Sequence, residues 1–463
     1  MKSMSIKVKN GMCKSSVFSY LKWYDYVVLA VVFIFMMLCL MHSDLRHTVS
    51  CSFALCNGHW TDFYTYNAKT ISMPDYDIVL YLIFALWNVP MMLAGKTMEM
   101  PGTISVVMLY NKLLPVIFLV LCAYMVYRIA RKIDISPRKS FYAAMLMLTV
   151  PYIFIIIAGM GMYDSIYLFF ILWGIYFLIG NGKRWEKIAG LLLFGISFGI
   201  KPLGAFILIP MLLYKEKNIL KVLAGGLIAM VPYVLCKLPF IGTMGAGGVR
   251  FVQNLFASAY GPEFFSVSLF CVAYILICAW VYHKQTEKDK PLKFLYIGML
   301  ALLPFYAFVP WNPQWLIAFV PFFALFTAIS THKNKYLLYD GILAVLFIGW
   351  IWAHYTEMTH GINPFGENAV AGSILPRLMQ LSLETPYVTT SVFPMQYAVL
   401  YLSGIVALLC FMVYQMNPWR NGAQYELMDG KENHSALYGR LHFMIPILVF
   451  MIPIVVWIIQ AAS

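Results

Sequence analysis

Residues 106–132 read VVMLYNKLLPVIFLVLCAYMVYRIARK, an apolar run that ends in a basic cluster. A bilayer core about 30 Å thick needs roughly 20 apolar residues in an α-helix, and the part from 106 to 127 meets that length. Arg128, Arg131 and Lys132 then mark the cytoplasmic end, because basic residues are enriched in cytoplasmic loops. The stretch predicts one membrane-spanning helix whose C-terminal end lies inside the cell.

The same pattern recurs along the chain. Of its 463 residues, 62% are hydrophobic and 11% are charged, whereas a soluble domain carries roughly 25% charged residues. We therefore predict an all-α polytopic membrane protein with about 11–13 transmembrane helices in a single domain, residues 1–463. Spans are expected near 24–42, 106–127, 141–159, 165–181, 219–237, 264–282, 292–309, 315–331, 337–354, 393–415 and 442–460, so that 393–463 holds the C-terminal spans.

The net charge of +13 comes from short basic clusters between the apolar stretches. Nucleic-acid binding is not expected, since that function gathers its charge on one surface. Dispersed clusters are instead typical of cytoplasmic loops. We assign seven clusters to the cytoplasm: the N-terminus (1–23, followed by an uncleaved first helix), 128–139, 183–187, 215–221, 284–293, 333–335 and 420–440.

This topology leaves two apolar segments that do not fit as simple spans. Ile78–Met92 is short and contains Asn88 and Pro90, so we expect an interfacial helix in a long first outer loop, residues 43–105. Residues 188–214 have basic flanks on both sides and break at Lys201-Pro202, since proline disfavours helix at the preceding residue. A hairpin of two short helices fits this segment, and one arm acting as a true span is the alternative.

Polar residues on the predicted outer side are candidates for a functional site, because charge near lipid is costly. Each has an alternative structural role: Asp44 and Asp164 can cap helices, Asp62 can solvate a loop, and the aromatic residues of the 311–315 turn can anchor the interface. Cys51 and Cys56 in the outer loop can form a disulfide or stay reduced. The candidates are Asp44, Arg46, Asp62, Tyr64, Asp164, Lys201, Arg250, Asn312 and Gln314.

Three segments resemble a known superfamily. They read GMGMYDS at 159–165, AGLLLFGISFGIKPLGAFILIPMLLY at 189–214 and WNPQWLIAFVPFF at 311–323. Together with an Asp just past the first span, they resemble the GT-C integral-membrane glycosyltransferases, in the mannosyltransferase-like branch that uses polyprenyl-phosphate sugars. The resemblance covers roughly residues 20–330. It implies a multi-pass protein of the cell membrane with its active site on the outer face.

The resemblance also implies the chemistry. A polyprenyl-phosphate-sugar donor would pass its sugar, with inversion, to a glycan or lipid acceptor. A carboxylate then serves as the base and cations stabilise the departing phosphate. Asp44 is the expected catalytic base, Lys201, Arg250 and Arg377 are the expected phosphate ligands, and the other candidates would bind substrate. The one Asp-x-Asp of the loop, Asp75-Tyr76-Asp77, lies far from the first span, so the cofactor stays open between none and a divalent metal.

Two other functions stay open from the sequence. A transporter or flippase of lipid-linked sugars would favour charges within the spans and repeated halves, whereas polar residues here gather in the outer loops. A surface-polysaccharide polymerase would show a large outer loop late in the chain, and residues 355–392 are long enough for one.

Overall fold

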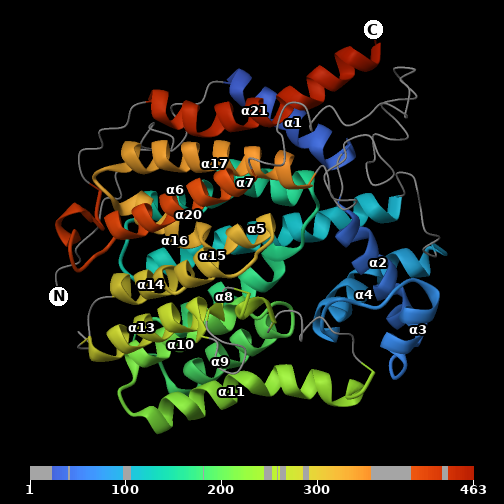
Figure 1. The fold of residues 1–463 in the computed structure, drawn as a ribbon, viewed down its shortest axis with the longest axis horizontal. Coiled ribbons are helices and arrows are strands. Elements are labelled where there is room, and N and C mark those ends of the chain that lie inside the picture. Colours follow the sequence, from blue (N-terminus) through green and yellow to red (C-terminus); the bar gives the residue numbers. More distant parts are fainter. Residues whose placement is uncertain are drawn as a thin grey trace, which may run out of the picture.

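The computed structural model describes residues 23–39, 42–96, 106–180, 182–243, 253–257, 259–260, 267–284, 291–355, 398–429 and 436–462. Within these ranges the chain is almost entirely helical (Figure 1). The helices and strands are, in order, α1 (Trp23–Cys39), α2 (Ser43–Cys56), α3 (Phe63–Thr70), α4 (Ile78–Leu93), α5 (Val106–Lys132), α6 (Pro137–Thr149), α7 (Pro151–Phe154), η1 (Ile155–Gly159), α8 (Asp164–Leu178), α9 (Arg184–Phe198), α10 (Leu203–Lys215), α11 (Ile219–Lys237), η2 (Leu238–Phe240), β1 (Ala259–Tyr260), β2 (Val267–Ser268), α13 (Leu269–His283), α14 (Pro291–Leu300), α15 (Leu303–Phe308), η3 (Pro313–Ala318), α16 (Val320–Ile329), α17 (Lys333–Tyr355), α20 (Ala398–Gln415), η6 (Gly422–Gln424) and α21 (Ala436–Ala462).

The helices have the composition of membrane spans. In the described part of the chain, 4 helices are long and apolar enough to cross a bilayer. The number rises to 5 if the bent pair formed by Pro137–Thr149 and Pro151–Gly159 is counted as one span. Further apolar helices of 10–17 residues accompany them. The predicted all-α polytopic membrane fold is therefore confirmed, while the full number of crossings stays a prediction.

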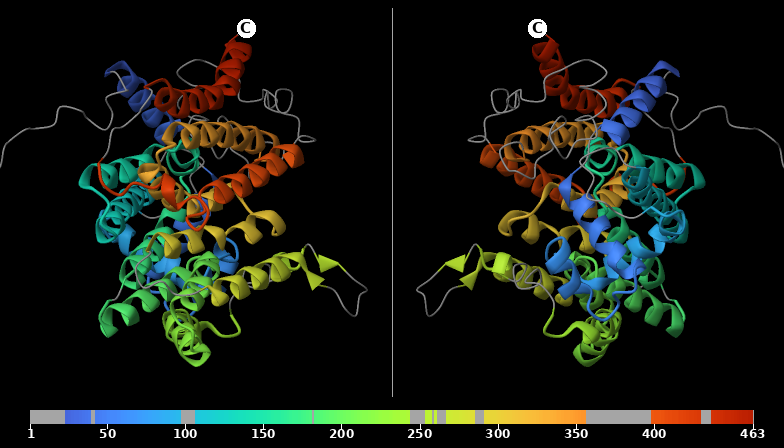
Figure 2. Two further views of the ribbon diagram at one scale, coloured as in Figure 1. Left: turned by 90° about the vertical axis from the view of Figure 1, so that its left-hand side faces the viewer. Right: turned by 90° about the vertical axis from the view of Figure 1, so that its right-hand side faces the viewer.

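The helices form a bundle in which α2, α3 and α4 gather at one end (Figure 1). The only strands among the described residues are β1 and β2, which pair antiparallel. They form a small hairpin that projects from the side of the bundle (Figure 2). Cys51 and Cys56 both lie in α2 as free thiols.

Basic residues tie the helices together at the end opposite to α2. Lys132 donates to the Tyr176 carbonyl and Lys217 to the Tyr282 carbonyl, each at 2.7 Å. Lys139 donates to the Glu426 carbonyl at 2.8 Å. Lysine side chains can donate to carbonyls that helix ends leave unpaired. The lysines at this end therefore both carry the charge of the basic clusters and hydrogen-bond to backbone carbonyls. We call it the basic end, and the end with α2, α3 and α4 the loop end.

Glycines let neighbouring helices approach closely. A Cβ at Gly195 of α9 would meet the Ala229 carbonyl oxygen of α11 at 2.0 Å, and one at Gly174 of α8 would meet Phe194 at 2.6 Å. Neither position has room for a side chain. Close backbone approach is how membrane helices gain packing energy, since lipid tails are as apolar as the side chains themselves.

Polar side chains fix α4 against α5 at the loop end. Asn88 and Asn111 exchange amide hydrogen bonds of 2.9 Å and 2.7 Å. Trp87 and Tyr110 stack with ring centroids 4.6 Å apart, and each donates to the other's carbonyl. Asn88 therefore has a packing role in a segment where its polarity had argued against a simple span.

A second polar cluster joins helices that are distant in the sequence. Asp340 of α17 accepts a hydrogen bond from the Tyr152 hydroxyl of α7 at 3.0 Å, and its other oxygen contacts His442 of α21. All three side chains are buried. The cluster lies just after the break between α6 and α7, where the chain bends by 52°.

Candidate functional site

The turn between η1 and α8 brings the first loop helix onto the bundle. Gly161 in this turn has φ +71°, and a Cβ there would meet Leu45 of α2 at 2.8 Å. Glycine is required on both counts, because it tolerates positive φ and leaves room for Leu45. The N–H of His42 donates to the Met160 carbonyl at 2.9 Å. The start of α2 is thereby held against the start of α8.

A buried ion pair lies directly beneath this junction. Asp164, the first residue of α8, contacts the Nζ of Lys201 through Oδ1 at 2.5 Å. Lys201 occupies the break between α9 and α10 and is followed by Pro202. The backbone N–H of Lys201 still donates to the Ser197 carbonyl. The two side chains are 0% and 3% exposed, and Asp164 Oδ2 is buried with no hydrogen-bond partner among the described residues. A buried carboxylate needs an opposite charge beside it, here the ammonium group of Lys201, to stay ionised.

Aromatic rings surround the ammonium group of Lys201. Its Nζ lies 5.5–5.8 Å from the centroids of four rings, those of Tyr76, Tyr163, Tyr167 and Trp315. Ring faces attract a cation within about 6 Å, most strongly where water is excluded. We call Lys201, Asp164 and these four rings the aromatic cage. It joins the loop before α4, the α8 turn, the α9–α10 break and η3.

Asp44 stands beside the cage and is more accessible than Asp164. Its side chain is 35% exposed, and the Nδ1 of His42 lies 3.4 Å from its Oδ1. The same nitrogen accepts the Asp44 N–H at 3.1 Å, which caps α2. Partial burial raises the pKa of Asp44, but His42, Lys201 and His47 outweigh it and hold that pKa below its ordinary value. Asp44 therefore stays ionised at neutral pH.

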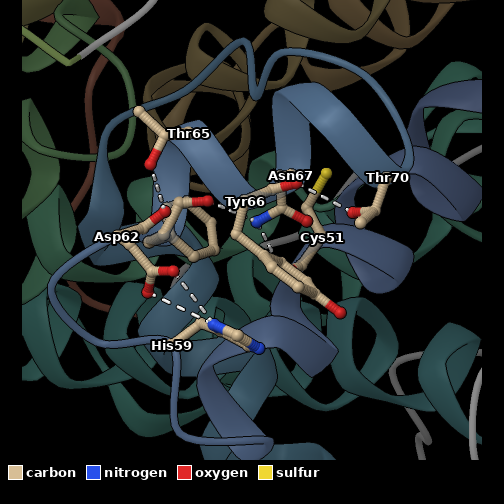
Figure 3. Close-up of polar contacts among 8 residues, drawn as sticks. Cys51, His59, Asp62, Thr65, Tyr66, Asn67 and Thr70 are labelled. Atoms are coloured by element: carbon tan, nitrogen blue, oxygen red, sulfur yellow. Dashed lines mark hydrogen bonds and ion pairs between the residues drawn. The ribbon is translucent and has the colours of Figure 1, made fainter.

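The other predicted site residues of the first loop lie apart from the ion pair. Asp62 precedes α3 and accepts from the His59 Nδ1 at 3.1 Å (Figure 3). Tyr64 is 1% exposed and donates to the Tyr76 carbonyl at 3.1 Å. Arg46 is half-buried, with no partner for its Nε among the described residues. Tyr64 thus touches the cage through the backbone of Tyr76, while Asp62 is part of a surface cluster.

The late turn contributes one buried and one exposed candidate. Gln314 of η3 is 1% exposed, and its Oε1 has no hydrogen-bond partner in the described part of the chain. Asn312, just before η3, is exposed. Arg250 and Arg377 lie outside the described residues. No group of three or more His, Cys, Asp or Glu among the residues described here could hold a metal ion.

Sequence reasoning missed the tyrosines of the cage. Tyr76 had been considered only as the middle residue of Asp75-Tyr76-Asp77, and Tyr163 only as part of the turn preceding Asp164. Their signal was weak, because aromatic residues at a membrane interface are common for other reasons.

Comparison with known proteins gives a family for part of the chain. Residues 74–234 match the dolichyl-phosphate-mannose-protein mannosyltransferase family. No curated protein matches the chain. The structure of ArnT from Cupriavidus metallidurans bound to undecaprenyl phosphate is 12% identical, with a TM-score of 0.47 over 94% of this chain and 76% of ArnT. The oligosaccharyltransferase AglB from Archaeoglobus fulgidus, in complex with an inhibitory peptide and a dolichol-phosphate, is 14% identical, with a TM-score of 0.30 over 96% of this chain and 56% of AglB.

The fold and the family match agree with each other. The described chain is a polytopic bundle of apolar helices, and the matched stretch contains Tyr76, Asp164 and Lys201 of the cage. This family match agrees with the resemblance to GT-C integral-membrane glycosyltransferases that the sequence showed. Asp44 lies outside the matched stretch, so its role depends on geometry.

Proposed function

We propose that the protein transfers a sugar from a polyprenyl-phosphate-linked donor to a glycan or lipid acceptor, with inversion, at the outer face of the cell membrane. The observation that carries the proposal is a partly exposed carboxylate, Asp44, and a buried cation, Lys201, at the same junction between the start of α2 and the start of α8. An inverting transfer needs these two groups: a base for the acceptor hydroxyl and positive charge near the departing phosphate.

Burial favours Asp44 over Asp164 as the base. A general base must come within hydrogen-bond reach of the acceptor hydroxyl, which requires an accessible carboxylate. Asp44 keeps 35% of its side chain exposed, whereas Asp164 is fully buried and bound to Lys201. Asp44 would take the acceptor proton while the acceptor oxygen bonds to the anomeric carbon. The bond from that carbon to the phosphate oxygen breaks, and polyprenyl phosphate leaves with the electron pair.

Lys201, within the aromatic cage, would stabilise the departing phosphate. Its Nζ is buried and already paired with Asp164, so its field, rather than a surface contact, would stabilise the growing negative charge. A low-dielectric surrounding strengthens such a field. The remaining proposed substrate contacts are Arg46, Asp62, Tyr64, Asp164, Arg250, Asn312 and Gln314.

The two ends of the bundle support the orientation. The basic end carries the clusters expected in the cytoplasm, including the contacts of Lys132, Lys139 and Lys217. Asp44 and the cage lie at the loop end, so the positive-inside bias favours an outer active site and a cytoplasmic N-terminus. The donor phosphate would then sit at the outer headgroup level with its tail among the lipids.

The test is a transfer assay on the purified full-length protein with a panel of radiolabelled polyprenyl-phosphate sugars. Wild-type protein should transfer one of them, and product anomers identified by NMR should be inverted. Asp44→Asn should lower turnover by about 10²–10⁴-fold, the usual cost of removing a general base. The matched control is Asp134→Asn in the loop between α5 and α6, where φ is +63° and asparagine is tolerated. Near wild-type turnover by Asp44→Asn would refute the base assignment.

A further inference from the structure

Residues 71–77 join α3 to α4 and supply one ring of the aromatic cage. That ring belongs to Tyr76, and its centroid lies 5.7 Å from Lys201 Nζ. The backbone of Tyr76 is held on both sides, because its carbonyl accepts from the Tyr64 hydroxyl at 3.1 Å and its N–H donates to the Tyr81 hydroxyl at 3.4 Å. We call residues 71–77 the strap. The position of the strap therefore decides the position of a cage ring.

Side chains fasten both ends of the strap to other helices. At one end, the Ser72 hydroxyl and the Nε2 of His47 are hydrogen-bonded at 2.6 Å. His47 lies in α2, one turn after Asp44. At the other end, Asp77 Oδ1 lies 3.0 Å from the Nζ of Lys237, the last residue of α11. The strap thus connects the helix that carries Asp44 with the end of α11.

The Asp77 carboxylate is directed at Lys237 and not at its own helix. Asp77 is the N-cap residue of α4, a position where aspartate usually accepts from the first N–H groups of the helix. Its side chain makes no such hydrogen bond to the described residues of α4. The Nζ of Lys237 also contacts the Tyr233 hydroxyl and lies 4.2 Å from the centroid of that ring. Asp77 and Lys237 are 20% and 24% exposed, so water screens their attraction less than that of a surface pair.

The end of α11 also reaches the cage through an aromatic contact. Phe240 of η2 meets Tyr64 edge to face with ring centroids 5.3 Å apart, and Tyr64 is the residue that holds the Tyr76 carbonyl. α11 itself runs along the edge of the bundle (Figure 1), and little of it is buried. A peripheral helix can shift at small cost in packing, so a directed ion pair at its end gives the strap a defined attachment.

We propose that Asp77 and Lys237 are a positioning pair that holds the strap against the cage. The held strap keeps the Tyr76 ring beside the ammonium group of Lys201, which is 3% exposed. Exclusion of water strengthens the field of Lys201 on a departing phosphate. Neither residue of the pair touches the reacting atoms, and both act through the strap. The effect on turnover rests on the proposed function, whereas the effect on the strap does not.

Hydrogen–deuterium exchange of the purified full-length protein tests the strap directly. Asp77→Lys places two cations together, so a peptide covering residues 71–77 should exchange about tenfold faster, because exchange follows the free energy of local opening. Adding Lys237→Asp restores opposite charges and should slow the exchange again. The rescue should be partial, since each charge then lies at the unfavourable end of its helix dipole.

Transfer kinetics test what the strap does for the reaction. In Asp77→Lys we expect kcat to fall about tenfold with little change in the donor KM, because the field of Lys201 acts mainly on charge that develops in the transition state. The double variant should regain much of this loss. Glu216→Lys is the matched control: Glu216 lies 3.8 Å from Lys221 at the other end of α11, and that exposed pair should contribute little to exchange or turnover.

Each outcome decides one part of the inference. Strap exchange that is unchanged in Asp77→Lys, or that stays fast in the double variant, would refute the positioning pair. Faster strap exchange with wild-type kcat would refute its part in catalysis. If the wild-type protein transfers sugar from no polyprenyl-phosphate donor, the proposed function fails, and the exchange rates still decide whether the pair holds the strap.

Discussion

Two buried acid–base pairs in this protein differ in how completely their carboxylates are satisfied. Asp340 has a partner for each oxygen, Tyr152 on one and His442 on the other. Asp164 has Lys201 on one oxygen, and its second oxygen has no hydrogen-bond partner among the described residues. A buried carboxylate with a partner on each oxygen connects helices and stabilises the fold. A buried carboxylate oxygen without a partner destabilises the fold, so its presence needs a reason other than stability.

The surroundings of the two pairs support this difference. The Asp340 cluster ties α17 and α21 to α7, just after the helix break. The Asp164 pair lies under four rings and beside the partly exposed Asp44. We therefore expect changes at the first cluster to alter stability and changes at the second to alter catalysis.

Of the changes at the two buried pairs, Lys201→Met should have the largest effect. It removes the cation that we propose stabilises the departing phosphate, and we expect turnover to fall about 10²–10³-fold, as when one group that stabilises the transition state is lost. It also leaves the Asp164 carboxylate buried without a counter-charge, which costs about 3–5 kcal/mol. Activity must therefore be measured per folded molecule, by size-exclusion chromatography followed by the transfer assay.

A double variant separates the two consequences of losing Lys201. In Lys201→Met with Asp164→Leu, no charge stays buried, so stability should return toward that of the wild type. Turnover should stay low, because the cation is still absent. If the double variant recovered transfer, the pair would be structural, and the comparison with Asp340 would fail.

The next effect should be a loss of stability in Asp340→Leu. The change leaves Tyr152 and His442 without their buried partner, and each unsatisfied group costs about 1–3 kcal/mol. We expect a lower thermal midpoint in detergent and wild-type turnover per folded molecule at low temperature. A drop in turnover as large as that of Lys201→Met would place the Asp340 cluster in the catalytic machinery instead.

The sequence was informative where one stretch of chain carries its own signal. The predicted span at 219–237 coincides with α11, and the predicted span at 106–127 lies within α5. The proline after Lys201 indicated the break between α9 and α10, which the structure places at 199–202. Hydropathy and proline act on the segment that contains them, so helices and helix breaks can be predicted from them without knowledge of the fold.

Contacts between distant segments could not be read in this way. The predicted span at 141–159 is bent by 52° between Pro137–Thr149 and Pro151–Gly159, and only Pro151 hinted at it. The Asp340 cluster joins residues more than a hundred positions apart, and nothing in the sequence near Asp340 indicates its partners. Asp44, Asp164 and Lys201 were each predicted for the site, but their proximity depended on the Gly161 turn.

The smallest effect should be a shift in the pH profile of His42→Asn. Asparagine is a good N-cap and can still accept the Asp44 N–H, so α2 should keep its start. The change removes the imidazole, which is the main group lowering the pKa of Asp44 against the effect of burial. That pKa should therefore rise. A base with a raised pKa becomes protonated at higher pH, so the acid limb of kcat/KM should move to higher pH. Turnover should fall on the acid side of the profile and change little on its alkaline side. A limb that moves to lower pH, or not at all, would show that His42 does not hold Asp44 ionised and that only Lys201 and His47 do.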